Sequence, residues 1–244
     1  MSEGKMIRQL LWFELKSTPV FKYLLTFFAI AVIVFLTNNL AVDITSESRL
    51  PVFYDIMFIS AICVPIFILR YKPFTISDLK GGLYASSFFI LLKQTPISDK
   101  VIRKSRFIMT GIYTFALNSL LFLLLYFYST PFQQWLSGTE AIVLWISWLA
   151  ISYLMGGSFA AGEPGQVYTT TYLVVFTVVF YGIVIGILTG FNIVFGMPIV
   201  AWTIIMAQSQ PLLLLLISLA TLVISTLILL NEYNRYIKSV DYRM

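Results

Sequence analysis

The strongest constraint on this chain is a set of long, nearly uncharged runs, each about as long as a lipid bilayer is thick. A hydrocarbon core of about 30 Å requires about 20 apolar residues in a helix. Hydrophobic residues make up 59% of the chain and charged residues only 11%. We therefore predict an all-α integral membrane protein, with a single transmembrane domain over residues 1–244. Six runs are expected to form transmembrane helices: 20–41, 52–70, 107–128, 139–161, 168–190 and 211–230.

A seventh apolar stretch, 191–210, differs from these six runs. Gly196 and Pro198 interrupt it, and it follows the fifth run without a hydrophilic turn. A full crossing would need such a turn, and irregular backbone at membrane depth must be covered by protein. We expect a short re-entrant or interfacial helical pair on the outer side, before the sixth transmembrane helix.

The basic residues predict the orientation of the chain. Of the 16 Lys and Arg residues, 15 fall on one side of the predicted bilayer, and only Arg49 falls on the other. Basic loops stay in the cytoplasm, so the N-terminus and the C-terminus are both predicted to be cytoplasmic. This rule also accounts for the net charge of +5. No nucleic-acid partner is needed to explain it.

The N-terminal segment, residues 1–19, has the pattern of an amphipathic helix that lies in the membrane interface and contacts lipid. Glu14 falls inside its apolar arc, where an unpaired carboxylate would be costly. We predict an ion pair between Glu14 and a basic residue before the third transmembrane helix, either Arg103, Lys104 or Arg106. The alternative is a rotated helix in which Glu14 reaches headgroup water.

The cytoplasmic segment 71–106 is the longest loop. It is too short to be an ATPase domain, yet "GGLYASSFFILLKQ" is apolar enough to be a short helix. Thr95 precedes Pro96 and should end that helix. Ser98 can cap the next helix, with Asp99 in its first turn. The chain is therefore expected to form a helix, a sharp turn and a second helix on the cytoplasmic surface, which is a shape suited to docking.

A few polar or small residues in the predicted membrane helices, and in the turn between two of them, are further candidates. Asp55 and Asn118 are candidates for a substrate path, although Asp55 could simply favour the positive end of a helix dipole. The second cytoplasmic turn, Glu163, Pro164 and Gly165, is explained either by turn chemistry or by contact with a partner. The stripe of Gly182, Gly186 and Gly190 would let two helices approach closely, within the subunit or across a homodimer.

Catalytic chemistry is not expected on this chain. It has no histidine and a single cysteine, Cys63, so no usual metal-ligand spacing and no His-based acid catalysis can be built. The P-loop pattern for ATP binding is also missing. We predict neither an enzyme nor a metal or other cofactor site.

The layout as a whole resembles the permease subunit of an ABC type-2 exporter. The most specific local match is Leu91-Leu92-Lys93-Gln94-Thr95-Pro96-Ile97-Ser98, followed by Ile102 and Arg106. In this family such a motif leads from a leucine-rich coupling helix into the third transmembrane helix. Two features depart from the family pattern: Asp78 stands where many members have glutamate, and there is no large outer domain. These departures leave the substrate unspecified.

The resemblance implies that the helix before Pro96 is a coupling helix that docks into a separate ABC ATP-binding subunit, which would hold ATP and Mg. It implies a bacterial cytoplasmic (plasma) membrane location and a dimer of identical or closely paralogous permease chains. Small members of the family often export peptides, antimicrobial agents or other amphipathic molecules. The alternative is a stand-alone membrane binding or immunity protein with no ATPase partner. The implied coupling residues are Leu83, Tyr84, Phe88, Phe89, Leu92, Thr95, Pro96, Ser98 and Asp99.

Overall fold

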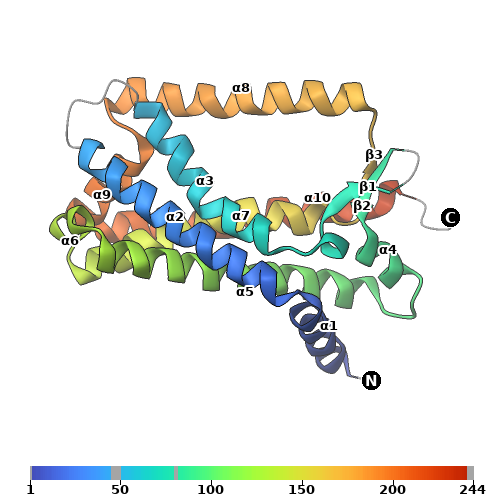
Figure 1. Ribbon diagram of the computed structural model, residues 1–244. Helices are drawn as coiled ribbons and strands as arrows, with labels where there is room; N and C mark the ends of the chain where they lie inside the picture. The colour runs from blue at the N-terminus through green and yellow to red at the C-terminus, as the bar shows by residue number, and fades with distance from the viewer. Residues whose placement is uncertain (1, 45–50, 80–81, 241–244) are drawn as a thin grey trace.

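The computed structural model describes residues 2–44, 51–79 and 82–240, and within them the chain is a bundle of long helices (Figure 1). Six helices are long and apolar enough to cross a membrane, which makes this a multi-pass membrane protein by length and composition. Arg49, Lys80 and Arg243 lie outside the described residues. The six helices are α2 (Val20–Ile44), α3 (Pro51–Leu69), α5 (Asp99–Tyr128), α7 (Gly138–Gly162), α8 (Thr170–Phe195) and α10 (Pro211–Ser239).

The shorter elements gather at the two ends of the bundle (Figure 1). One end, which we call the sheet end, holds both ends of the chain. The opposite end, which we call the α9 end, holds α6 (Thr130–Trp135) and α9 (Ile199–Ser209). The elements of the sheet end are α1 (Glu3–Ser17), the 3₁₀ helix η1 (Lys72–Phe74), β1 (Ile76–Asp78), β2 (Leu83–Ser86), α4 (Ser87–Lys93) and β3 (Gln166–Val167).

A small antiparallel sheet corrects the expectation of an all-α chain. Its strand order is β1-β2-β3, with Ser77 opposite Ala85 and Tyr84 opposite Gln166. Residues 83–86, predicted as the start of a helix, form the central strand, and α4 begins only at Ser87. Leu83 and Ala85 point inward, and β3 comes from the turn after α7. The local pattern could not reveal this strand pairing, because one partner is about 80 residues away in the sequence.

The stretch 191–210 forms one short helix where a helical pair was predicted. Residues 191–195 continue α8, which ends where Gly196 adopts a φ of +68° and donates its N–H to the Asn192 carbonyl. After Pro198, α9 has 11 residues. At 1.5 Å per residue it is about 16 Å long, which is too short to cross a bilayer. Its position against α3, α7 and α10 packs it into the α9 end of the bundle.

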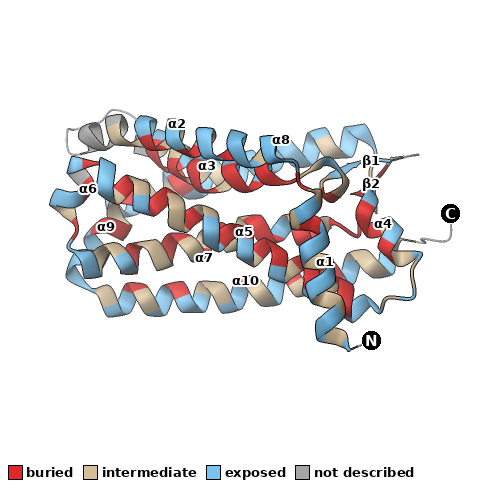
Figure 2. Cartoon of the chain, turned by 60° about the horizontal axis from the view of Figure 1, so that its bottom comes forward, coloured by how far each residue is buried: buried red, intermediate tan, exposed pale blue. Residues whose placement is uncertain are grey.

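The helices differ greatly in how much of them is buried (Figure 2). In α5 and α7, 44% of the apolar window is buried inside the chain, whereas in α8 the share is 6%. Figure 1 shows α8 standing apart along one side of the bundle. At Gly182, Gly186 and Gly190, no atom from elsewhere in the described chain lies within 4 Å of the position that a Cβ would take. The glycine stripe therefore packs against nothing within the described part of this subunit.

Candidate functional site

Arg106 lies at the centre of a buried cluster of charges near the sheet end. It projects from α5 and is 1% exposed. Its Nη2 donates to Glu163 Oε1 at 2.9 Å, its Nε donates to Glu163 Oε2, and its Nη1 donates to Glu14 Oε2. Arg106 thus joins α1 to the turn that follows α7.

Arg70 completes the cluster from the end of α3. Its Nη1 donates to Glu163 Oε1 at 3.1 Å, and its Nη2 donates to Thr110 Oγ1 at 2.7 Å. Two cations and two carboxylates therefore meet in the interior with no net charge, and none of the four residues is more than 3% exposed. We call Glu14, Arg70, Arg106 and Glu163 the charge cluster.

Aromatic rings cover the charge cluster and connect it to α4. The Arg106 guanidinium lies 5.4 Å from the Phe74 ring centroid and 5.6 Å from the Phe88 centroid. A guanidinium at this distance from a ring is attracted by the ring quadrupole. Phe88 also stacks on Phe13 of α1, with centroids 5.5 Å apart. The inner face of α4 is therefore held by the same arginine that pairs with Glu14 and Glu163.

Charges buried this deeply are favourable only because each is paired. Burial lowers the pKa of Arg70, and the neighbouring Glu163 carboxylate opposes that change. Replacing an entire buried pair by apolar residues is often neutral, but removing one partner costs about 3–5 kcal/mol, because a charge is left uncompensated. The charge cluster therefore acts as a unit that fixes α1, α3, α5 and the α7–α8 turn relative to one another.

The structure brings together only some of the residues predicted for the ion pair. Of the three basic candidates, Arg106 pairs with Glu14. Arg103 instead donates to Asn234 Oδ1 at 2.8 Å, and Lys104 pairs with Glu3 at 2.9 Å. Only Arg106 lies on the buried face of α5, which a count of charges along the sequence does not distinguish.

Glu163 corrects the simpler prediction for the second cytoplasmic turn. It is fully buried and binds both arginines, so turn chemistry does not explain it. The turn itself is made by Gly165, whose φ is +85°, next to Pro164. A Cβ at Gly165 would lie 2.5 Å from the Tyr84 carbonyl oxygen, so this turn packs closely on β2. The one available signal was that Glu163 and Arg70 both sit at ends of apolar runs, on the same predicted side.

Lowering the pH is expected to loosen the first turn of α1. Lys104 donates a hydrogen bond to Glu3 and Lys100 lies close by, and together they lower the pKa of the Glu3 carboxyl. The contact is therefore complete above the ordinary carboxyl pKa and is lost as pH falls through the lowered value. We expect amide exchange in this turn to be slower in wild type than in a Glu3→Gln variant above about pH 4, and to approach that of the variant as the pH falls below this value.

The test is which of the two proteins, wild type or Glu3→Gln, exchanges its amides more slowly in the first turn of α1. In wild type the protection should exceed that of Glu3→Gln at neutral pH, and the two should converge in acid. The difference should be small, because an exposed ion pair contributes little. Identical exchange in both proteins at every pH would show that Glu3 does not hold α1.

The predicted coupling residues on α4 point inward, and this is a second correction. Phe88, Phe89 and Leu92 are at most 6% exposed and pack in a hydrophobic cluster with Ile102 and Tyr233. They cannot form a contact surface for another subunit without opening that cluster. In β2, Leu83 is buried as well, and Tyr84 is only half-buried.

The outer face of α4 and the turn after it are available instead. Leu91 is 56% exposed, and Gln94, Pro96, Ser98 and Asp99 are exposed too. We call this set the outer α4 face. Pro96, Ser98 and Asp99 of the predicted coupling residues belong to this set, whereas those on α4 itself do not, since a helix of seven residues is too short for the apolar pattern to define a face.

The turn after α4 is held by its own side chains. Thr95 Oγ1 donates to the Leu92 carbonyl at 2.6 Å, and Lys93 pairs with Asp99 at 2.7 Å. Ser98 occupies the N-cap position of α5 as predicted, although its side chain makes no capping hydrogen bond there. The outer α4 face therefore has a defined shape.

Asp55 and Asn118 do not meet in one path. Asp55 is fully buried near the α9 end and accepts the backbone N–H groups of Ile199 and Val200, each at 2.9 Å. Asp55 therefore stabilises the positive end of a helix dipole, which was one of its two predicted roles. The helix is α9, not the helix that carries Asp55. Asn118 is 1% exposed and donates to Ser152 Oγ at 2.6 Å, between α5 and α7.

Comparison with protein-family models, with curated proteins and with solved structures gives no match for this chain. Among the described residues, no group of three His, Cys, Asp or Glu side chains could hold a metal ion. The site instead consists of α4, whose outer face is exposed and whose inner face packs on the charge cluster at the ends of several long helices.

Proposed function

We propose that this chain is the permease subunit of an ATP-driven ABC exporter in a bacterial plasma membrane, with both termini in the cytoplasm. A separate ATPase subunit would bind ATP and Mg and dock on the outer α4 face. Two permease chains, identical or closely paralogous, would form the path for an amphipathic or hydrophobic substrate. The proposal combines the motif at Leu91–Ser98 with the geometry of the sheet end.

The observation that carries this proposal is the two-sided character of α4. On its inner face, the Phe88 ring contacts the Arg106 guanidinium and therefore the charge cluster. On its outer face, Leu91 is exposed. A partner that moves the outer face would have to move the cluster with it. A ligand shifts a conformational equilibrium only through contacts that differ between the two states, and a rigid contact can supply that difference.

A single long helix, α5, connects α4 to the α9 end of the bundle. After the turn at Pro96, α5 runs for 30 residues, about 45 Å, without interruption. It carries Arg106 near its start and packs against α7. A displacement of the outer α4 face would thus reach the α9 end along a single rigid helix.

The test is replacement of Leu91 by Asp, followed by purification of the chain from membranes of its source cell and mass spectrometry of bound proteins. A P-loop ATPase in about equal amount should accompany wild type. A charge in a docking contact costs several kcal/mol, so Leu91→Asp should reduce the bound ATPase about tenfold or more. The exposed side chain makes this variant tolerable to the fold.

Val167→Asp is the matched control. Val167 is 61% exposed at the same end of the bundle, on β3, away from the outer α4 face. It should leave the ATPase bound. Wild type that purifies with no ATPase would contradict the permease proposal and favour the stand-alone membrane binding or immunity protein. Equal loss in both variants would show that α4 is not the docking element.

A further inference from the structure

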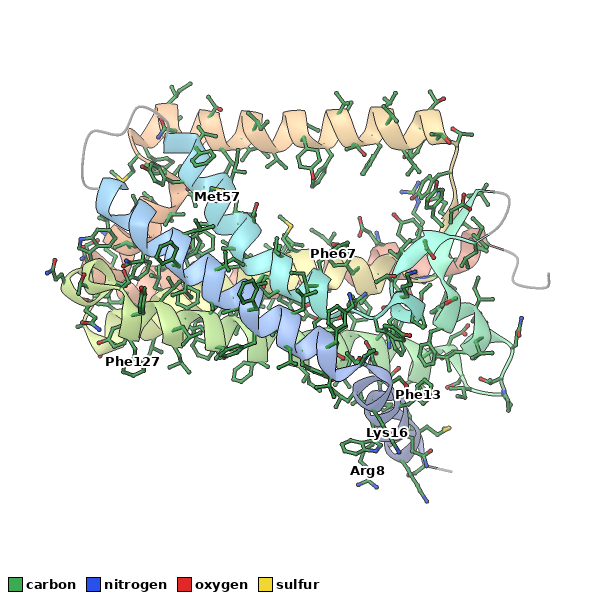
Figure 3. The ribbon with its side chains drawn as sticks, viewed as in Figure 1. Arg8, Phe13, Lys16, Met57, Phe67 and Phe127 are labelled. Atoms are coloured by element: carbon green, nitrogen blue, oxygen red, sulfur yellow. The ribbon has the colours of Figure 1, made fainter. Side chains whose placement is uncertain are left out.

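The exposed side of α1 is a basic surface with a tryptophan at its centre. Arg8, Trp12 and Lys16 follow one another every fourth residue, so they lie on one face of the helix. Lys5 and Gln9 lie beside this stripe and are also exposed, and Trp12 is 67% exposed. Figure 3 shows Arg8 and Lys16 on α1, with Arg8 directed away from the bundle. We call Lys5, Arg8, Gln9, Trp12 and Lys16 the Trp12 face.

The apolar side of α1, from which contact with lipid was predicted, packs on the protein. Leu10, Leu11 and Leu15 are partly buried against hydrophobic clusters of the bundle. Glu14 lies on the same side and pairs with Arg106. The Trp12 face is therefore the side of α1 that is left for a partner.

The contacts of α1 place it at the level where the chain enters the membrane. It runs across the direction of the long helices, along the side of the bundle (Figures 1 and 2). The apolar window of α2 starts at Val20, almost directly after α1 ends. Arg106, which holds Glu14, directly precedes the predicted run 107–128. The Trp12 face is therefore turned sideways at the level of the lipid headgroups.

The Trp12 face has three positive charges that no carboxylate offsets. The two carboxylates of α1 are engaged elsewhere, Glu3 with Lys100 and Lys104, and Glu14 with the buried Arg106. Within the described residues, no cation of the Trp12 face forms a salt bridge. Basic residues beside a membrane helix are attracted by anionic lipid, and a guanidinium matches the geometry of a phosphate. An amphipathic tryptophan ring prefers the boundary between headgroups and hydrocarbon.

We propose that the Trp12 face binds the headgroups of anionic phospholipids in the leaflet at the sheet end. Arg8 and Lys16 contact the phosphates, and the Trp12 ring inserts between them. Bound lipid stabilises α1, because the stripe exists only while this segment is helical. The inference needs only the position of the long helices in a membrane and does not depend on the proposed ATPase.

The test is amide exchange of the full chain in nanodiscs of phosphatidylcholine alone and of phosphatidylcholine mixed with phosphatidylglycerol. Peptides covering 3–17 should exchange at least about fivefold more slowly in the mixed discs, because each basic residue near an anionic surface contributes about that factor to binding. High salt should remove the difference, since it screens exposed charges. Equal exchange of α1 in the two lipids, or a difference that survives high salt, would overturn the proposal.

A double variant locates the effect on the Trp12 face. Arg8→Gln with Lys16→Gln removes two charges whose side chains make no hydrogen bond or ion pair within the described residues. Its exchange should match wild type in phosphatidylcholine, which shows that α1 is folded, and should no longer respond to phosphatidylglycerol. A response that persists in this variant would overturn the proposal.

Arg235→Gln with Lys238→Gln is the matched control. Both residues are exposed on α10 at the sheet end, so this variant loses the same net charge at the same end of the bundle. It should keep the slowing by phosphatidylglycerol. Equal loss in both double variants would show that net charge alone attracts the lipid, and would overturn the assignment to the Trp12 face. The lipid and salt comparisons in wild type do not depend on either variant.

Discussion

Replacing Arg106 by Met is expected to lower the free energy of unfolding by about 3–5 kcal/mol, the usual cost of removing one partner of a buried ion pair. Glu14 would lose its cation, and Glu163 would keep only Arg70. Methionine fills much of the vacated space, so the loss reports the uncompensated carboxylates and not a cavity. Thermal unfolding of the purified protein in detergent measures the effect.

Two further variants separate charge from packing in this result. Arg103→Met changes a half-buried arginine on the same helix, whose hydrogen bond to Asn234 is exposed, and should change stability far less. The double variant Arg106→Met with Glu14→Gln removes the orphaned carboxylate and should be more stable than Arg106→Met alone. If the double variant is no more stable, uncompensated charge at Glu14 is not the cause of the loss.

Replacing Asp55 by Ala is expected to cost about 2–4 kcal/mol and to loosen α9 before the rest of the bundle. The first N–H groups of a helix have no partner within the helix, and here Asp55 supplies it for Ile199 and Val200. Hydrogen bonds to a charged group are worth more than neutral ones, and the N–H groups would be left in a poorly solvated place. Unfolding in detergent gives the total cost, and amide exchange of α9 locates it.

The matched control is Glu140→Ala, which removes an acidic side chain at the same end of the bundle. Glu140 accepts the Ser137 N–H at 2.7 Å in an exposed capping box, so its loss should cost only about 1 kcal/mol. Asp55→Asn keeps one acceptor oxygen and should fall between wild type and Asp55→Ala. Exchange in α9 that is unchanged by Asp55→Ala would mean that Pro198 and packing alone hold the helix start.

Both predictions concern residues whose importance the sequence indicated without showing their partners. An unpaired carboxylate inside an apolar arc or run carries a large desolvation cost. This cost alone marks Glu14 and Asp55 in the sequence as residues that need a partner. Which groups pair with them depends on how distant segments meet. Glu14 finds Arg106, some 92 positions away, and Asp55 finds the start of α9, about 144 positions away.

The wrong predictions have a shared origin in short elements. The strand β2 and the seven-residue helix α4 are too brief for periodicity to define a type or a face. Their conformation is decided by contacts: β2 lies between β1 and β3, and Phe88 and Phe89 turn into the cluster around Ile102 and Tyr233. The outer α4 face is what remains exposed after that packing.

The sequence by itself determined the six apolar helices and the turn at Pro96, and it predicts the segregation of basic residues to one side of the bilayer. These follow from the length of a bilayer and the cost of charge inside it, which act on each segment separately. Only the tertiary structure decided that Glu163 is a buried partner of two arginines and that α4 exposes Leu91. These depend on which faces of distant helices pack together, a property that no single segment carries.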